Sequence, residues 1–265
     1  MAESESMRFT SFSTSFQVRA DDEAVGAGVA DRARTLGWTR TLDDGASVDY
    51  VIRRARQDGQ VATTYELDCD GAAICRTTDL DLLLDAFEDH AKIQTAWRAQ
   101  RVLFVHAGVI GWQGRGIVMP GRSGVGKTTL VRALIAAGAE YYSDEFAILD
   151  ANGRVHPYPR PLSIRTGEAE GRLCPAEKIG ARIGTTPLAI DLIVSTEYRR
   201  GARWRPRALS PAEALLALMA NTVAARQHPQ LTLPFLRQAV LHARALWSPR
   251  GSASSIVARL LAELR

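Results

Sequence analysis

Cysteine and long apolar runs are both scarce in this chain of 265 residues. Its three cysteines, at positions 69, 75 and 174, are irregularly spaced with no histidine close by, which excludes a disulfide framework and argues against a zinc site. The most apolar stretches, 188–194 and 214–220, fall well short of the roughly 20 residues that span a bilayer. The acidic start, Met1–Ser6, is not followed by the apolar run of a signal peptide. We therefore expect a cytoplasmic protein with reduced thiols and no membrane partner.

Lysine is also rare, because only three of the 33 basic residues are lysines: Lys92, Lys127 and Lys178. A compact ammonium and a planar guanidinium are not interchangeable at a phosphate group. A lysine in a chain that otherwise uses arginine therefore marks a position where the smaller cation is the better fit.

The remaining composition is that of a globular protein, with 46% apolar and 23% charged residues, and it excludes fibrous or wholly disordered classes. The length suits one large domain or two modest ones. Residues 1–100 carry 18 acidic and 11 basic side chains, a net charge of −7, whereas residues 101–265 carry 11 and 22, a net charge of +11. This split predicts two units with different roles.

Residues 1–100 show the pattern of a small α+β module. The first dozen residues are either a frayed start or a first strand. Alternating apolar residues and turn signals then predict strands, and apolar stripes predict helices. No catalytic constellation occurs here, so we expect an accessory or recognition module. The expected elements are a helix at 24–36, strands at 48–52, 61–69 and 72–76, and a helix at 79–100.

Residues 101–265 follow a different pattern, with apolar strands that alternate with helices in α/β order. The tail, 210–265, is expected to be helical, since Ser210, Pro211 and Glu213 form a capping box with proline at the first helical position. The expected strands lie at 102–110, 117–119, 141–142, 146–149 and 188–195, and the expected helices at 130–138, 214–225, 233–247 and 253–264.

The segment between the second strand and the first helix matches the P-loop pattern G-x-x-x-x-G-K-[ST] at every fixed position. Glycines let the backbone N–H groups approach a triphosphate closely, and the following helix adds its unpaired N–H groups. Lys127 would reach the β- and γ-phosphates, and the Thr128 hydroxyl would bind Mg²⁺. The alternative is a glycine-rich turn that only caps a helix. The expected nucleotide-binding residues are Gly121, Arg122, Ser123, Gly124, Val125, Gly126, Lys127, Thr128 and Thr129.

A kinase or hydrolase also needs acidic residues near this loop. Asp150 and Asp191 each end or interrupt an apolar strand and are candidates. Asp144 and Glu145 are better placed, since they follow the strand after the loop's helix, at the sheet edge where the loop lies. One carboxylate there could hold Mg²⁺ while the other accepts a proton from a hydroxyl. The alternative is a solvated acidic turn. His106, alone in an apolar strand, fits a core residue as well as a functional one.

Three of these elements, in order, resemble the catalytic core of HPr kinase/phosphorylase and of shorter HPr-kinase-like proteins from peptide-modification gene clusters. They are the runs 104–109, 116–128 and 138–145, in a resemblance that covers about residues 101–165. The resemblance implies an α/β fold with a P-loop kinase core of the HPr-kinase type, an α+β N-terminal module and a helical C-terminal tail.

The resemblance also implies roles for individual residues. Asp144 matches the aspartate that deprotonates the acceptor serine, and His106 matches the histidine that supports it. Glu145 falls near the metal, and Thr128 stands where the family usually has serine. The family's regulatory domain and its later Arg-Gly segment have no counterpart that we can identify in the chain.

Two further segments carry clustered features. Five arginines lie between Arg199 and Arg207, interleaved with Tyr198 and Trp204. They indicate either a docking loop for an acidic acceptor or nucleic acid, or a solvated loop. The proline-rich run 156–161 must be extended, and with Arg160 and Arg165 it could line the acceptor side of a cleft.

Together these patterns predict an ATP-dependent kinase that uses Mg²⁺ and phosphorylates a hydroxyl, that of a serine in a protein or peptide. The catalytic residues would be Asp144, His106 and Lys127, with Thr128 and Glu145 at the metal. The alternatives are a nucleotide-binding regulatory module without transferase activity and a small-molecule kinase. Nucleic acid is not expected as a partner, and homo-oligomerisation stays open.

Overall fold

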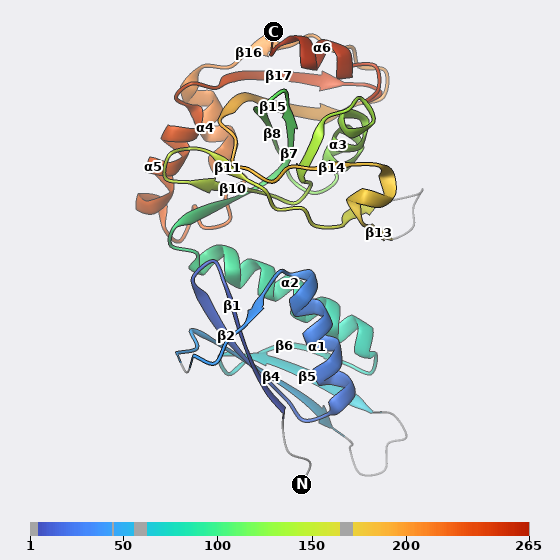
Figure 1. The fold of residues 1–265 in the computed structure, drawn as a ribbon, viewed down its shortest axis with the longest axis vertical. Coiled ribbons are helices and arrows are strands. Elements are labelled where there is room, and N and C mark those ends of the chain that lie inside the picture. The colour runs from blue at the N-terminus through green and yellow to red at the C-terminus, as the bar shows by residue number, and fades with distance from the viewer. Residues whose placement is uncertain (1–4, 44, 56–62, 165–171, 265) are drawn as a thin grey trace. The chain divides into compact units, whose positions relative to one another are not determined.

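The structure, a computed structural model, describes residues 5–43, 45–55, 63–164 and 172–264. The chain divides into two compact units, Met1–Arg101 and Val102–Arg265 (Figure 1). Among the described residues, no helix combines the length and the apolar character needed to cross a membrane.

The first unit is a six-stranded sheet with two helices. The strand order is β3-β1-β2-β4-β5-β6, in which β2 and β4 are parallel and the other neighbours antiparallel. The elements are β1 (Glu5–Ser11), β2 (Thr14–Ala20), α1 (Glu23–Thr35), β3 (Thr39–Arg40), β4 (Val48–Ala55), β5 (Thr64–Cys69), β6 (Ala72–Thr77) and α2 (Leu80–Arg98).

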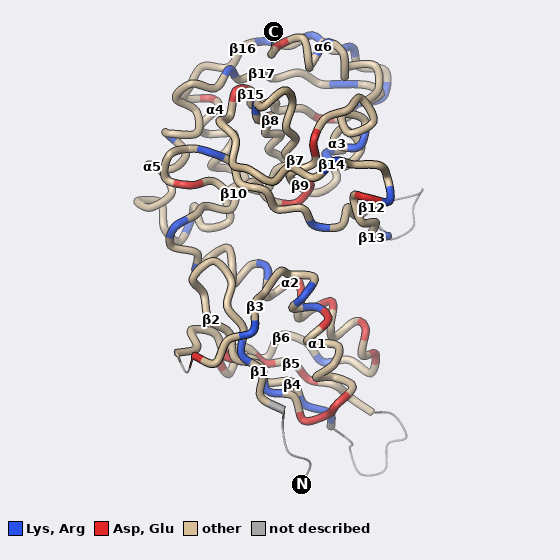
Figure 2. Tube along the Cα trace, viewed as in Figure 1, with Lys and Arg blue, Asp and Glu red and all other residues tan. Residues whose placement is uncertain are grey.

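Both helices of this unit share one core with one face of the sheet. Apolar residues of β1, β2, β4 and β5 form a single buried cluster with those of α1 and α2. Asp22 and Asp79 cap the two helices, since each side chain accepts hydrogen bonds from the first-turn N–H groups. Ion pairs join neighbouring strands of the sheet, as between Arg19 and Asp49. Figure 2 shows that acidic positions recur along α2.

The elements expected in this unit are confirmed, but the sequence pattern does not predict β2. Positions 61 and 62 of the expected strand 61–69 lie outside the described residues, and the observed strand begins at Thr64. The turn that joins β1 to β2 consists of Phe12 and Ser13, at φ 47° and 66°. These residues give no glycine or asparagine turn signal, so the hairpin could not be predicted from turn chemistry.

The second unit is built on a nine-stranded mixed sheet. The main strand order is β11-β10-β7-β8-β15-β17-β16, and β9 joins this sheet through β7 and pairs with β14. The strands β8, β15 and β17 are parallel to one another, whereas β7 is antiparallel to β8 and β9. The strands are β7 (Val102–Trp112), β8 (Arg115–Pro120), β9 (Glu140–Ser143), β10 (Phe146–Asp150), β11 (Val155–His156), β14 (Arg182–Ile183), β15 (Ile190–Tyr198), β16 (Arg207–Ala208) and β17 (Arg244–Arg250).

Helices cover both faces of this sheet (Figure 1). Ile117 and Met119 of β8 pack in one core with α3 (Lys127–Ala136) and α6 (Val257–Ala262). Val118, between them, packs in the other core with α4 (Pro211–Met219) and α5 (Pro229–Val240). This alternation is the strand period of two. A small sheet of β12 (Leu162–Ile164) and β13 (Arg172–Cys174) and a 3₁₀ helix, η1 (Ala176–Ile179), complete the unit.

The sequence predicts a helical tail over 210–265, but this segment contains the strand β17 as well as helices. The capping box at the start of α4 is confirmed, with the Ser210 side chain bonded to the Glu213 N–H and the Glu213 side chain returned to Ser210. The helix expected at 233–247 is wrong beyond Val240, where the chain forms β17 beside β15. Adjacent residues Ala245 and Leu246 pack on opposite faces of the sheet. A strand buried on both faces lacks the alternation that distinguishes strand from helix.

Candidate nucleotide site

The glycine-rich segment 121–128, named here the Gly121–Thr128 loop, connects β8 to α3. Gly124 and Gly126 both lie at φ 89°, a left-handed conformation that favours glycine. α3 begins at Lys127, and its N-cap, Gly126, offers no side chain to the first-turn N–H groups. These N–H groups and the positive end of the helix dipole therefore favour an anion at the start of α3.

Two titratable side chains, those of Lys127 and His106, contact the first residue of this loop. The Lys127 Nζ donates hydrogen bonds to the carbonyl oxygens of Gly121, at 2.7 Å, and Arg122, at 3.0 Å. The His106 Nδ1, from β7, lies 2.8 Å from the same Gly121 oxygen. Because a carbonyl oxygen only accepts, the proton of a neutral His106 is on Nδ1, and Nε2 has a free lone pair. The loop is thus tied to β7 as well as to its own helix.

The acidic pair lies where the chain passes from β9 to β10. Both strands pair with β7, so the crossing residues Asp144 and Glu145 lie beside it. The crossing is built by Ser143, a fully buried residue whose Oγ accepts hydrogen bonds from the N–H groups of Glu145, at 3.2 Å, and Phe146, at 3.1 Å. The Ser143 side chain thus supplies an acceptor for two main-chain N–H groups at this point.

Asp144 contacts the start of α3 directly. The Thr128 hydroxyl donates a hydrogen bond to Asp144 Oδ2 at 2.6 Å. The other oxygen, Asp144 Oδ1, is buried and has no hydrogen-bond partner among the described residues. A buried carboxylate oxygen without a partner is costly unless a cation or a proton reaches it. This oxygen is therefore available to a ligand of the site.

Burial shifts the proton affinities of the three titratable groups. It raises the pKa of Asp144 to about 6, against the opposing effects of the Thr128 hydrogen bond and the Lys127 charge. It lowers the pKa of Lys127 to about 8, although the carboxylates of Asp144 and Glu145 favour the charged form. The pKa of His106 is lowered by burial and by the Lys127 charge. At neutral pH the site thus holds an ionised Asp144, a charged Lys127 and a neutral His106.

The oxygen atoms of this cluster fit Mg²⁺. Hydroxyl and carboxylate oxygens are the ligands that Mg²⁺ prefers, and it takes few protein ligands where phosphate oxygens supply the others. The Thr128 hydroxyl is bonded to the carboxylate of Asp144, and the carboxylate of Glu145 follows next in the chain, so oxygen ligands of both kinds are present at the start of α3. Within the described ranges no group of three or more His, Cys, Asp or Glu side chains is placed to hold a metal by itself.

The expected residues do not all come together. No hydrogen bond joins His106 to Asp144 in the part of the chain that the structure describes; the histidine bonds the loop backbone instead. Asp150 is a turn residue, with its carboxylate bonded to the N–H groups of Asn152 and Arg154. Asp191 lies near the start of β15, at the end opposite Tyr198, and its side chain is 34% exposed.

The two clustered segments have separate surroundings. The Arg160 guanidinium lies over the Tyr158 ring, 4.4 Å from its centroid, and Arg165 lies outside the described residues. The arginine-rich segment 199–207 begins beside the loop, since the N–H of Tyr198 donates to the Val125 oxygen at 3.3 Å. Its first and last arginines form exposed ion pairs, Arg199 with Glu197 and Arg207 with Glu213.

Sequence reasoning missed Arg250, which also contacts the loop. This residue, at the end of β17, is 1% exposed, and its Nη2 donates to the Gly126 oxygen at 2.6 Å. Its guanidinium lies 5.9 Å from the centroid of the Tyr198 ring. One arginine among so many carries no sequence signal, and the pattern predicts a helix over the first part of its strand.

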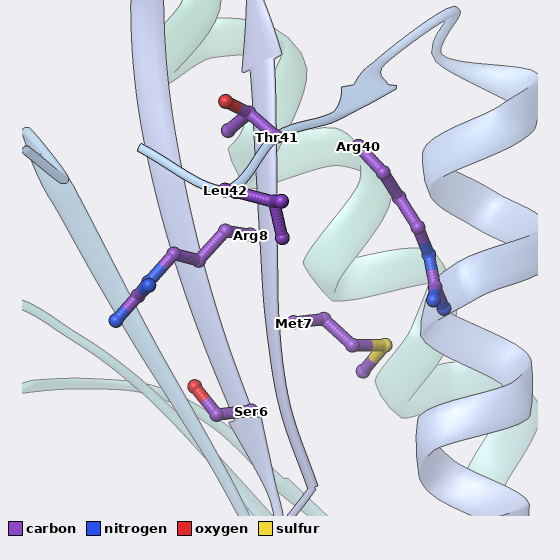
Figure 3. A pocket seen from close by; sticks show the side chains of 6 residues that line it. All are labelled: Ser6, Met7, Arg8, Arg40, Thr41 and Leu42. Carbon is purple, nitrogen blue, oxygen red and sulfur yellow. The ribbon is translucent and has the colours of Figure 1, made fainter. Parts of the chain in front are cut away.

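A separate pocket of about 260 Å³ lies in the first unit, beside β1 and β3 (Figure 3). It contains two arginines and no acidic side chain, and none of the expected site residues belongs to it. The pocket is lined by Ser6, Met7, Arg8, Arg40, Thr41 and Leu42.

Comparison with known proteins gives distant similarities to solved structures. No protein-family model matches the sequence, and no curated protein matches it. Among solved structures, the Hpr(Ser) kinase/phosphatase from Coxiella burnetii is similar to this chain, with 16% sequence identity and a TM-score of 0.36. The match covers 61% of this chain and 95% of that protein. A similarity this distant is not evidence of a shared site.

Proposed function

We propose that the second unit binds ATP and Mg²⁺ at the Gly121–Thr128 loop and transfers the γ-phosphoryl group to a hydroxyl, that of a serine in a protein or peptide. The observation that carries the proposal is the 2.6 Å hydrogen bond between Thr128 and Asp144. It joins the Gly121–Thr128 loop to a carboxylate that has one buried oxygen without a partner among the described residues.

The loop would hold the triphosphate through its backbone N–H groups and the start of α3. Lys127 now donates to two carbonyl oxygens of its own loop, and its flexible stem lets the ammonium turn to the β- and γ-phosphates. Thr128 and Glu145 would hold Mg²⁺, which neutralises the charge that develops on the phosphate oxygens when bound.

Asp144 would act as the general base. With a pKa of about 6 it is ionised at neutral pH, yet basic enough to accept the proton of the acceptor hydroxyl. The bond from the serine oxygen to the γ-phosphorus forms as the bond from that phosphorus to the β–γ bridging oxygen breaks, and ADP leaves with the bonding electron pair. The proton passes to Asp144 and then to water.

His106 would act as a positioning residue. Its Nδ1–H fixes the Gly121 carbonyl, and the Gly121 N–H in turn donates to the His106 oxygen at 3.2 Å. These two bonds hold the first residue of the loop against β7, at the strand beside which Asp144 lies. The histidine therefore fixes the position of the loop relative to Asp144, the proposed general base.

The proposal is tested by incubating the protein with labelled ATP, Mg²⁺ and candidate serine peptides. Asp144→Asn should lose transfer of label by about 10²-fold or more and keep ATP binding. Lys127→Ala should weaken both. Asp191→Asn is the matched control, because this carboxylate lies at the opposite end of β15, and it should behave as wild type.

Several results would contradict the assignment. Full transfer by Asp144→Asn would remove Asp144 as the base. Unchanged ATP affinity in Lys127→Ala would remove the loop as the phosphate site. ATP binding by the wild type without transfer to any hydroxyl would identify a regulatory nucleotide-binding module instead of a kinase, and label on a small molecule alone would identify a small-molecule kinase.

A further inference from the structure

The nucleotide site has a second side that the phosphoryl-transfer residues do not use, and a role for that side rests on the proposed function. The strands β8, β15 and β17 are parallel neighbours, so their carboxyl ends lie at one edge of the sheet. At this edge β8 leads into the Gly121–Thr128 loop, β15 ends at Tyr198 and β17 ends at Arg250. Ligands of open α/β sheets bind at such an edge.

The proposed site fixes the direction in which a nucleotide would lie across this edge. β8 has β7 on one side and β15 on the other. His106 belongs to β7, and Asp144 and Glu145 lie beside it, so the γ-phosphate belongs on that side of the loop. The nucleoside end of the triphosphate is then left with the side formed by β15 and β17.

Tyr198 is an aromatic residue on that side, and it lies against the loop. Its N–H donates to the Val125 oxygen at 3.3 Å. Its Cβ lies 3.5 Å from the position that a Cβ on Gly126 would take. The residue is nevertheless 53% exposed. A large aromatic side chain is thus held next to the loop with about half of its surface in solvent.

Arg250 supports this ring. Its guanidinium lies over the ring, 5.9 Å from the centroid, while its Nη2 donates to the Gly126 oxygen at 2.6 Å. Arg250 is 1% exposed and its Nε has no hydrogen-bond partner among the described residues. The buried guanidinium of Arg250 therefore contacts both the Tyr198 ring and the Gly121–Thr128 loop. Such a charge is stabilised by an aromatic face and by a bound anion.

We propose that Tyr198 is the surface on which the purine base of the nucleotide stacks, and that Arg250 holds this ring in place beside the Gly121–Thr128 loop. Stacking on an aromatic side chain needs only the flat face of the base. Tyr198 is therefore a binding residue for the nucleoside, separate from the groups that handle the phosphates.

The test compares two ligands that differ by the nucleoside. Binding of ATP and of inorganic tripolyphosphate, each with Mg²⁺, is measured by titration calorimetry on the full chain. Tyr198→Ala should weaken ATP binding by about tenfold or more and leave tripolyphosphate binding unchanged. Tyr198→Phe keeps the ring and is the matched control, so it should bind both ligands as the wild type does.

Other outcomes separate this inference from the function on which it rests. If Tyr198→Ala weakens neither ligand, or both equally, the ring does not bind the base and the inference is wrong. If the wild type binds ATP no more tightly than tripolyphosphate, the purine base adds nothing to the affinity. The role of Tyr198 as a stacking surface is then wrong, whereas the proposed phosphate site is retained. If the wild type binds neither ligand, the proposed function is wrong, and so is the stacking role of Tyr198 that rests on it.

Discussion

Replacement of Asp144 by asparagine should change the pH dependence of stability as well as remove the proposed base. Asp144 is half-buried, and its buried oxygen Oδ1 has no hydrogen-bond partner among the described residues. Burial raises the pKa of this carboxyl from 3.8 to about 6. The folded protein therefore holds the Asp144 proton more tightly than the unfolded chain does. Asparagine has the same shape, can accept the Thr128 hydrogen bond, and never ionises.

The size of the effect follows from this shift. A raised pKa means that the folded state binds more protons than the unfolded chain between pH 3.8 and pH 6, so stability falls as the pH rises through this interval. Each unit of pKa corresponds to about 1.4 kcal/mol, which gives about 3 kcal/mol in all. Part of the unfolded ensemble is already ionised at pH 4, so about 2 to 3 kcal/mol of this loss falls between pH 4 and pH 8.

Urea denaturation of the wild type and of Asp144→Asn at pH 4 and pH 8 measures this difference. Any constant cost of the new amide cancels between the two pH values, and so do groups that titrate equally in both proteins. Between pH 4 and pH 8 the wild type should lose about 2 to 3 kcal/mol relative to the variant. Asp191→Asn, at a partly exposed carboxylate, should follow the wild type. Parallel pH profiles for the wild type and Asp144→Asn would refute the raised pKa.

Three further predictions concern the same loop and its support. ATP affinity should fall as the pH rises through about 8, because Lys127 loses its proton there; titration at pH 7 and pH 9.5 checks this, and an unchanged affinity would contradict the role of the ammonium. Ser143→Ala should destabilise the protein by about 1 to 3 kcal/mol in urea denaturation, since the N–H groups of Glu145, partly buried, and Phe146, buried, lose the Ser143 acceptor, and a neutral result would contradict that account. Gly126→Ala should lower ATP affinity more than Gly124→Ala does: both residues lie at φ 89°, but only at Gly126 would the new Cβ meet Arg250, at 2.6 Å. Equal losses in the two glycine variants would show that backbone strain alone matters.

Local signals are sufficient to predict most of the elements around the loop. The glycine and lysine spacing of segment 121–128 carries a backbone requirement, and the strand before it and the helix after it are clear from apolar patterning. The short strands 141–142 and 146–149 flank Asp144 and Glu145, which leaves the acidic pair at a strand end. Each of these predictions depends on residues that are neighbours in the chain.

Long-range contacts are not predictable in the same way. The bond from His106 to the Gly121 oxygen spans 15 positions and depends on the antiparallel pairing of β7 with β8. The bond from Arg250 to the Gly126 oxygen spans 124 positions and depends on β17, most of which the sequence pattern predicts as the end of a helix. A strand covered on both faces shows neither of the two periodicities by which sequence patterns are recognised.

The excess of basic residues in the second half of the chain has two physical origins in the structure. Arg199 and Arg207 lie at the surface in exposed ion pairs, which contribute little and need no ligand. Lys127 and Arg250 instead lie on two sides of the same loop and are both largely removed from water, and burial lowers the pKa of each. Two cations desolvated around one loop are stabilised when an anion binds between them, because that anion replaces the water each has lost. Under the proposed function that anion is the triphosphate of the nucleotide, and the surface arginines are not needed to bind it.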